Sequence, residues 1–126
     1  MNSLTVTSTL SAFLGLLVVA LAGATVAARV RSNTMLGDGG DASLARAIRA
    51  HGNLIEYAPI FLILLALLEL RGAPGWGLVS IAATFAVSRA LYVAYAYGGQ
   101  ALMLRIAGFW TTALPIAVAS VWLVLG

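Results

Sequence analysis

Long apolar runs separated by short polar links make up almost the whole of this chain. Four runs cover about residues 7–28, 42–70, 76–97 and 101–125. Each can cross a hydrocarbon core of ~30 Å at about 1.5 Å per residue, and none shows the strict alternation of a barrel strand. The pattern predicts an all-α integral membrane protein, a four-transmembrane-helix bundle that forms a single domain over residues 1–126.

The polar links contain the expected signals for turns and caps. The first link, residues 31–41, is polar and rich in Gly, and either Asp41 or Ser43 is placed to cap the second helix. The second link is a tight turn between antiparallel helices. Beside that turn we expect Glu69 and Arg71 to form a solvated ion pair.

Composition supports the membrane class and excludes several kinds of chemistry. Hydrophobic residues make up 62% of the chain and charged residues 9%, and the mean hydropathy is +1.02. Cys is absent, which excludes disulfides and thiolate metal ligands, so any thiol chemistry must come from a ligand. The net charge is +3, but the arginines lie at helix ends and inside helices rather than in one exposed patch, so we expect no nucleic-acid partner.

The distribution of arginine predicts the orientation. Most of the cations flank the first and third links, namely Arg29, Arg31, Arg46, Arg49 and Arg105. By the positive-inside rule, the first and third links are cytoplasmic and both termini are periplasmic. A chain rich in Ala, Leu and Arg and free of Lys is typical of a bacterial inner membrane protein. The first run could instead be a signal peptide, although nothing before Arg29 supplies the basic side chains that such a peptide needs.

The second run carries a polar stripe. At about 100° per residue, an arc of about 80° holds Arg46, Arg49, Asn53 and Glu56. An ionised Glu56 costs roughly 2.5 to 3.5 kcal/mol in lipid, so it requires a partner. Arg89 and Arg105 lie at a similar depth, and this excess of cations suits an anionic ligand. The alternative is that Glu56 only neutralises an arginine within the bundle.

One further ionisable residue lies outside the stripe. His51 is on nearly the opposite face of the same helix, and a lone His is a poor metal ligand. We therefore expect no metal site.

The motif Arg46-x-x-Arg49-Ala50-x-x-Asn53-x-x-Glu56-Tyr57-x-Pro59 resembles the MAPEG family, the membrane-associated proteins in eicosanoid and glutathione metabolism. This family contains glutathione transferases, prostaglandin E synthases and leukotriene C synthases. The pairs Arg29-x-Arg31 and Arg89-x-x-Tyr92, with Arg105, extend the resemblance along the chain. It implies a homotrimer that binds glutathione between subunits near the cytoplasmic side.

The resemblance also implies roles for individual residues. The positions that match glutathione contacts are Arg29, Arg49, Asn53, Glu56, Tyr57, Arg89 and Tyr92, with Tyr95 and Tyr97 as alternatives for one further position. Arg105 matches the arginine that relatives place against the glutathione sulfur, which makes it the expected catalytic residue. A cation there would favour the thiolate, for attack on a lipophilic small molecule or lipid that arrives from the membrane. The implied activity is that of a transferase or peroxidase.

Two positions depart from the family pattern. Gly52 stands where prostaglandin E synthases have Arg, and Phe109 replaces a Tyr that relatives have one turn after the catalytic Arg. Both differences argue against prostaglandin chemistry. Two other classes remain open: a catalytically silent family member that binds a lipid or protein partner, and a small four-helix transporter. Such transporters typically place an essential Glu in the first helix, and residues 7–28 contain no acid.

Overall fold

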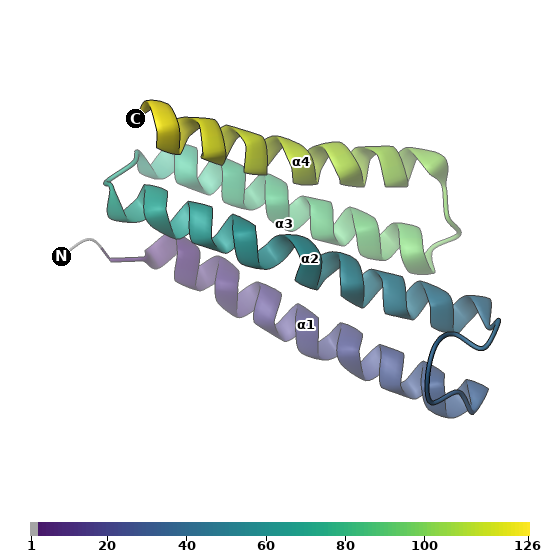
Figure 1. Ribbon diagram of the computed structural model, residues 1–126. Helices are drawn as coiled ribbons and strands as arrows, with labels where there is room; N and C mark the ends of the chain where they lie inside the picture. The colour runs from purple at the N-terminus through teal and green to yellow at the C-terminus, as the bar shows by residue number, and fades with distance from the viewer. Residues whose placement is uncertain (1–2) are drawn as a thin grey trace.

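The computed structural model describes residues 3–126 and consists of four antiparallel helices joined by short links (Figure 1). Their bounds are α1 Thr5–Ser32, α2 Ala42–Leu70, α3 Gly75–Tyr97 and α4 Leu102–Leu125. All four are long and apolar enough to cross a membrane. The predicted all-helical architecture with four potential membrane spans is therefore confirmed.

The largest difference from the predicted bounds is at the end of α1. The apolar run ends near residue 28, but the helix continues to Ser32, through Arg29 and Arg31 in its last turn. Cations are favourable there because they interact with the negative end of the helix dipole. Asn33 then stops the helix in a left-handed conformation with φ of 50°, and its N–H donates to the carbonyls of the last turn.

The first turn of α2 confirms one predicted cap. The Asp41 carboxylate accepts a hydrogen bond of 2.8 Å from the backbone N–H of Leu44. Asp41, rather than Ser43, is therefore the N-cap residue. This bond satisfies one of the amide donors that the start of a helix leaves without an intrahelical partner.

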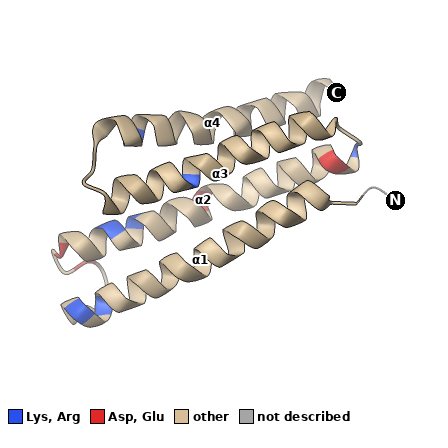
Figure 2. Cartoon of the chain, turned by 180° about the vertical axis from the view of Figure 1, so that it is seen from behind, with Lys and Arg blue, Asp and Glu red and all other residues tan. Residues whose placement is uncertain are grey.

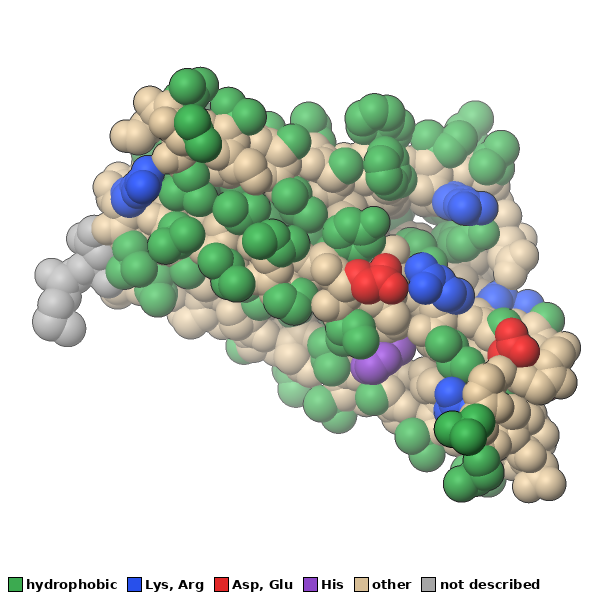
Figure 3. Space-filling model, viewed as in Figure 1, with side chains coloured by type: hydrophobic (Ala, Val, Ile, Leu, Met, Phe, Trp, Pro, Cys, Tyr) green, Lys and Arg blue, Asp and Glu red, His purple; other side chains and the backbone are tan. Residues whose placement is uncertain are grey.

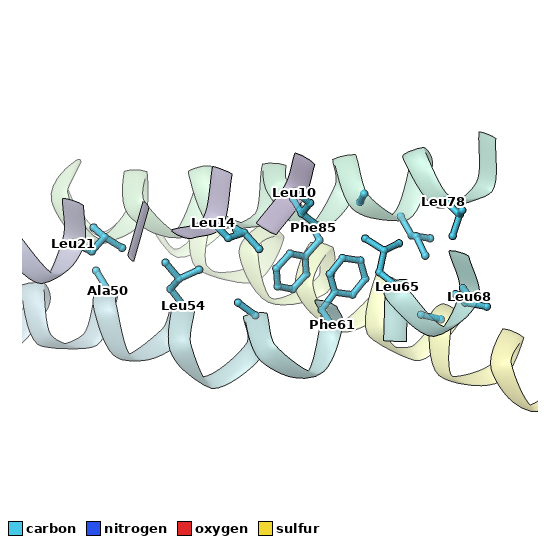
Figure 4. Close-up of a cluster of buried hydrophobic side chains, with 14 of the residues drawn as sticks. Leu10, Leu14, Leu21, Ala50, Leu54, Phe61, Leu65, Leu68, Leu78 and Phe85 are labelled. Carbon is cyan, nitrogen blue, oxygen red and sulfur yellow. The ribbon is translucent and has the colours of Figure 1, made fainter. Parts of the chain in front are cut away.

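The two central helices hold the bundle together. α2 packs against all three other helices, and α1 and α4 make no contact with each other in the described part of the chain. The core between α1, α2 and α3 is apolar, and the rings of Phe61 and Phe85 stack at its centre with centroids 4.2 Å apart (Figure 4). Near the start of α3, a Cβ at Gly77 would lie 2.5 Å from the Trp122 ring, so only glycine permits this approach of α4.

The predicted ion pair between Glu69 and Arg71 is wrong. Glu69 is only 8% exposed, and its carboxylate accepts hydrogen bonds from the backbone N–H of Val6 at 2.8 Å, the N–H of Thr7 at 2.9 Å and the Thr7 hydroxyl at 2.7 Å. Arg71 instead donates to the carbonyl of Leu123, 2.6 Å away. The physical reason is that helix ends carry unsatisfied amides and carbonyls, which are better partners for charges than a screened surface pair.

We call the contact of Glu69 with the first turn of α1 the α1 clasp. It involves Val6, Thr7 and Glu69, and it places a negative charge at the positive end of the α1 dipole. Arg71 places a positive charge at the negative end of the α4 dipole. Glu69 in the last turn of α2 and its C-cap residue Arg71 thus each satisfy one end of an outermost helix.

Candidate functional site

Most of the charged side chains gather in one half of the bundle. In Figure 2 most of the Lys and Arg positions lie in the half that contains the link between α1 and α2, and α2, α3 and α4 all contribute. Within that half, two adjoining clefts open between the three helices. They contain the residues on which a polar ligand could bind.

The inner cleft has a volume of about 180 Å³. Its lining comes from α2, α3 and α4 and consists of Arg49, Asn53, Tyr57, Tyr92, Arg105, Gly108, Phe109 and Thr112. The outer cleft, about 460 Å³, is closer to the helix ends and is lined by Ala42, Ala45, Arg46, Arg49, Tyr92, Tyr95, Ala96, Gln100 and Arg105. Three residues line both clefts, so a ligand of sufficient length can occupy them together.

Arg105 lies in the first turns of α4 with its guanidinium free of protein partners. It is exposed and lines both clefts, and its side chain makes no hydrogen bond or ion pair with another described residue. One turn later Phe109 lines the inner cleft, and its ring packs edge-on against Trp110 with centroids 5.4 Å apart. A cation thus lies next to an aromatic surface that is open to the lipid side of the bundle, since Phe109 is 56% and Trp110 63% exposed.

Arg49 and Glu56 form an ion pair on the outer face of α2. Their closest atoms, Nη1 and Oε1, are 3.5 Å apart, and the side chains are 61% and 52% exposed. Figure 3 shows acidic and basic side chains next to one another within a largely hydrophobic surface. At Gly52 an added Cβ would lie 3.8 Å from Glu56 Oε1 and 3.9 Å from Arg49 Nη1, so the missing side chain leaves space beside the pair.

The ion pair separates the predicted polar stripe into two parts. Arg49 lines the clefts, whereas Glu56 does not, and Asn53 points inward to the bundle rather than outward. An exposed ion pair within a membrane span is unfavourable in lipid. This face of α2 therefore requires water or protein against it.

Arg89 is buried behind the wall of the inner cleft. It is 2% exposed, and its Nη1 donates to Asn53 Oδ1 at 2.8 Å and to the Asn53 carbonyl at 3.3 Å. Nη2 donates to the Thr112 hydroxyl oxygen and Nε to Ser88 Oγ. The guanidinium carbon also lies 4.8 Å from the centroid of the Phe85 ring. Arg89 lines neither of the two clefts, so in this subunit it touches a ligand only through its neighbours.

The tyrosines differ in their access to the clefts. Tyr57 and Tyr92 line the inner cleft. Tyr95 lines the outer cleft, with its ring centroid 5.8 Å from that of Tyr92. Tyr97 is 50% exposed and lines neither cleft, but it lines a third hollow that shares Arg46, Ala96 and Gln100 with the outer cleft. Of the two alternatives left by the sequence, Tyr95 is the one that lines one of the two clefts.

Arg29 lies apart from the other predicted residues in this subunit. Its Nη1 donates to the carbonyls of Thr34 at 3.3 Å, Met35 at 3.2 Å and Gly37 at 2.9 Å. These bonds fasten the link between α1 and α2 to the end of α1. A role in the clefts would require a different conformation or a neighbouring copy of the chain.

Two residues of the inner cleft were missed by the sequence analysis. Gly108 and Thr112 follow Arg105 by three and seven positions on α4, and helical spacing puts all of them on one face. That spacing was the available signal. Gly108 is buried against α3, where an added Cβ would lie 3.9 Å from the Tyr92 backbone nitrogen.

Comparison with known proteins identifies the family. The family model described as MAPEG family matches residues 7–125. The chain is 32% identical over 97 residues to the inner membrane protein YecN of Escherichia coli strain K12, an alignment that covers 75% of this chain and 73% of that protein. The values are the same for YecN of Escherichia coli O6:H1. No solved structure matches the chain. Since the family model matches nearly the whole sequence, this protein belongs to the MAPEG family, as the motif on the second helix indicated.

Proposed function

We propose that this protein is a membrane-bound, glutathione-dependent transferase or peroxidase that activates the glutathione thiol for attack on a lipophilic electrophile. The observation that carries the proposal is the position of Arg105, which is unpaired and lines both clefts next to Arg49 and Tyr92. Family membership supports it, because the family is named for glutathione metabolism and five of the matching residues line the inner cleft, namely Arg49, Asn53, Tyr57, Tyr92 and Arg105.

The charges of the site suit the chemistry of glutathione. The tripeptide has two carboxylates, one amine and one thiol. Arg46 and Arg49 supply donors for carboxylates on the outer cleft, and Glu56 supplies the anion for the amine. A cysteine thiol of pKa ~8.5 is only about 3% ionised at pH 7, whereas a pKa lowered by ~2 units would make it roughly 75% ionised. Arg105 is the group proposed to cause that shift.

The oligomer and the membrane are part of the proposal. A homotrimer would cover the exposed Arg49–Glu56 pair and would bring a second copy of Arg29 to the site. The inner membrane is supported by the name of the YecN relatives. The cytoplasmic side of the site follows from the positive-inside rule. The electrophile would enter from the lipid past Phe109 and Trp110.

The test separates the role of Arg105 from simple binding. With saturating glutathione, the thiolate absorbance in the ultraviolet is followed against pH for the wild type, Arg105→Ala and Arg49→Ala. We expect Arg105→Ala to raise the pH midpoint by about 2 units while the affinity stays within a few fold, and Arg49→Ala mainly to reduce affinity. No thiolate in the wild type near pH 7, or an equal midpoint in Arg105→Ala, would favour a catalytically silent member of the family.

A further inference from the structure

The inner cleft contains cations and hydrogen-bond donors but no acid. Among its lining residues are two arginines, Arg49 and Arg105, and neither Asp nor Glu. The nearest acid in the stripe, Glu56, faces the outer surface, where it is paired with Arg49. The buried Arg89 adds a third positive charge directly behind the wall. The local charge balance is therefore strongly positive.

Arg89 determines which atom of the Asn53 amide is available to a ligand. A guanidinium can only donate hydrogen bonds, so the atom it meets at 2.8 Å must be the amide oxygen. The Nδ2 group is then turned away from Arg89. It has no hydrogen-bond partner in the described chain, and no buried side-chain nitrogen there lacks a partner, so Nδ2 is accessible. Asn53 lines the inner cleft and also a small hollow beside Arg89, so an accessible Nδ2 group can present its N–H donors to the cleft.

Three hydroxyl groups, those of Thr112, Tyr57 and Tyr92, complete the polar wall of the inner cleft. The Thr112 hydroxyl accepts from Arg89 and donates to the Gly108 carbonyl at 2.6 Å, so its proton is already used. The hydroxyls of Tyr57 and Tyr92 make no hydrogen bond to another described residue, so both protons are free to be donated.

We propose that the inner cleft is a compartment for a compact anion, and that Arg89 is a positioning residue which sets its polarity through Asn53 and Thr112. On the proposed function, the anion is the negatively charged end group of a bound glutathione, such as its thiolate. Arg89 acts without touching the ligand: it binds the Asn53 amide oxygen and the Thr112 hydroxyl oxygen, and so leaves the Asn53 N–H donors for the cleft. This role differs from the direct glutathione contact that the family resemblance assigns to Arg89.

The key variant is Asn53→Asp, because it reverses the polarity at one atom with little change in size. One carboxylate oxygen still accepts from Arg89, and the added charge pairs with a buried cation, so we expect the unfolding midpoint without ligand to be maintained or raised. The other oxygen faces the cleft as an acceptor. It should repel an anion while leaving a neutral group nearly unaffected.

The probes are glutathione sulfonate, with a fixed negative charge at the sulfur position, and S-methylglutathione, which is neutral there. In the wild type we expect the sulfonate to bind more tightly. Asn53→Asp should weaken sulfonate binding by about 10- to 100-fold and S-methylglutathione binding by less than about threefold. Thr112→Val removes a hydroxyl that holds the Arg89 guanidinium in place against Asn53, so it should reduce the preference in the same direction, and Thr112→Ser should retain it.

The control probe is hexanesulfonate, which has the same head group without the peptide. If the wild type binds hexanesulfonate and Asn53→Asp does not, while neither glutathione derivative binds either protein, the compartment stands and the glutathione function fails. Equal losses for the sulfonate and the neutral thioether would show that Arg89 and Asn53 are only structural. The proposal would also be overturned if the wild type bound glutathione sulfonate no more tightly than S-methylglutathione and did not bind hexanesulfonate.

Discussion

The α1 clasp makes a quantitative prediction about Glu69→Gln. The glutamate accepts three hydrogen bonds from Val6 and Thr7, whereas the amide of Gln offers one acceptor oxygen and turns an NH₂ group toward the same donors. Losing one hydrogen bond to a charged acceptor costs about 1.5 to 3 kcal/mol, and losing the charge at the helix N-terminus costs roughly 0.3 to 1 kcal/mol more. We expect the first turn of α1 to open more easily by about 2 to 4 kcal/mol.

Amide hydrogen exchange at Val6 and Thr7 in detergent measures this opening directly. The expected change is an acceleration of about 30- to 1000-fold in Glu69→Gln. Arg71→Gln is the matched control, because Arg71 contacts Leu123 instead and its loss should leave both amides unchanged. Exchange in Glu69→Gln within threefold of the wild type, or an equal effect of Arg71→Gln, would refute the clasp and restore the simple ion pair.

Two further predictions concern packing and orientation. Gly77→Ala should destabilise the bundle by about 1 to 3 kcal/mol in detergent unfolding, because the new Cβ would meet the Trp122 ring, whereas Gly15→Ala, which meets nothing within 4 Å, should be neutral or stabilising by up to about 1 kcal/mol. An equal effect of the two would show that the end of α4 moves away freely. Single cysteines placed at Gly37 and Gly99 in this Cys-free chain should react with an impermeant label only from the cytoplasmic side, and labelling of both from the periplasm would reverse the orientation of the site.

The sequence was sufficient for the helices and for most of the polar layer. Apolar runs of this length have few alternatives in a membrane, and the motif from Arg46 to Pro59 identified the family. The direction of each side chain could not be obtained in the same way. An arc on a helical wheel placed Asn53 and Glu56 together, but the packing of α3 and α4 turned one toward Arg89 and left the other at the surface.

Contacts between distant parts of the chain were beyond the sequence for a related reason. Glu69 and Arg71 are neighbours in sequence, and proximity favoured a mutual pair. Their actual partners, Thr7 and Leu123, are identified only once the helix ends are placed side by side. Similarly, Arg89 matched a family position for a ligand contact, and only its burial shows that it lies behind the cleft wall.

The α1 clasp also imposes an order on biogenesis. Val6 and Thr7 leave the ribosome long before Glu69, from which they are separated by more than sixty residues. Until α2 has been synthesised, the leading amides of α1 have no carboxylate and can be satisfied only by water or lipid head groups at the membrane surface. The hairpin of α1 and α2 can therefore complete its own polar contacts before α3 is inserted, whereas Arg71 can meet the end of α4 only after α4 has been synthesised.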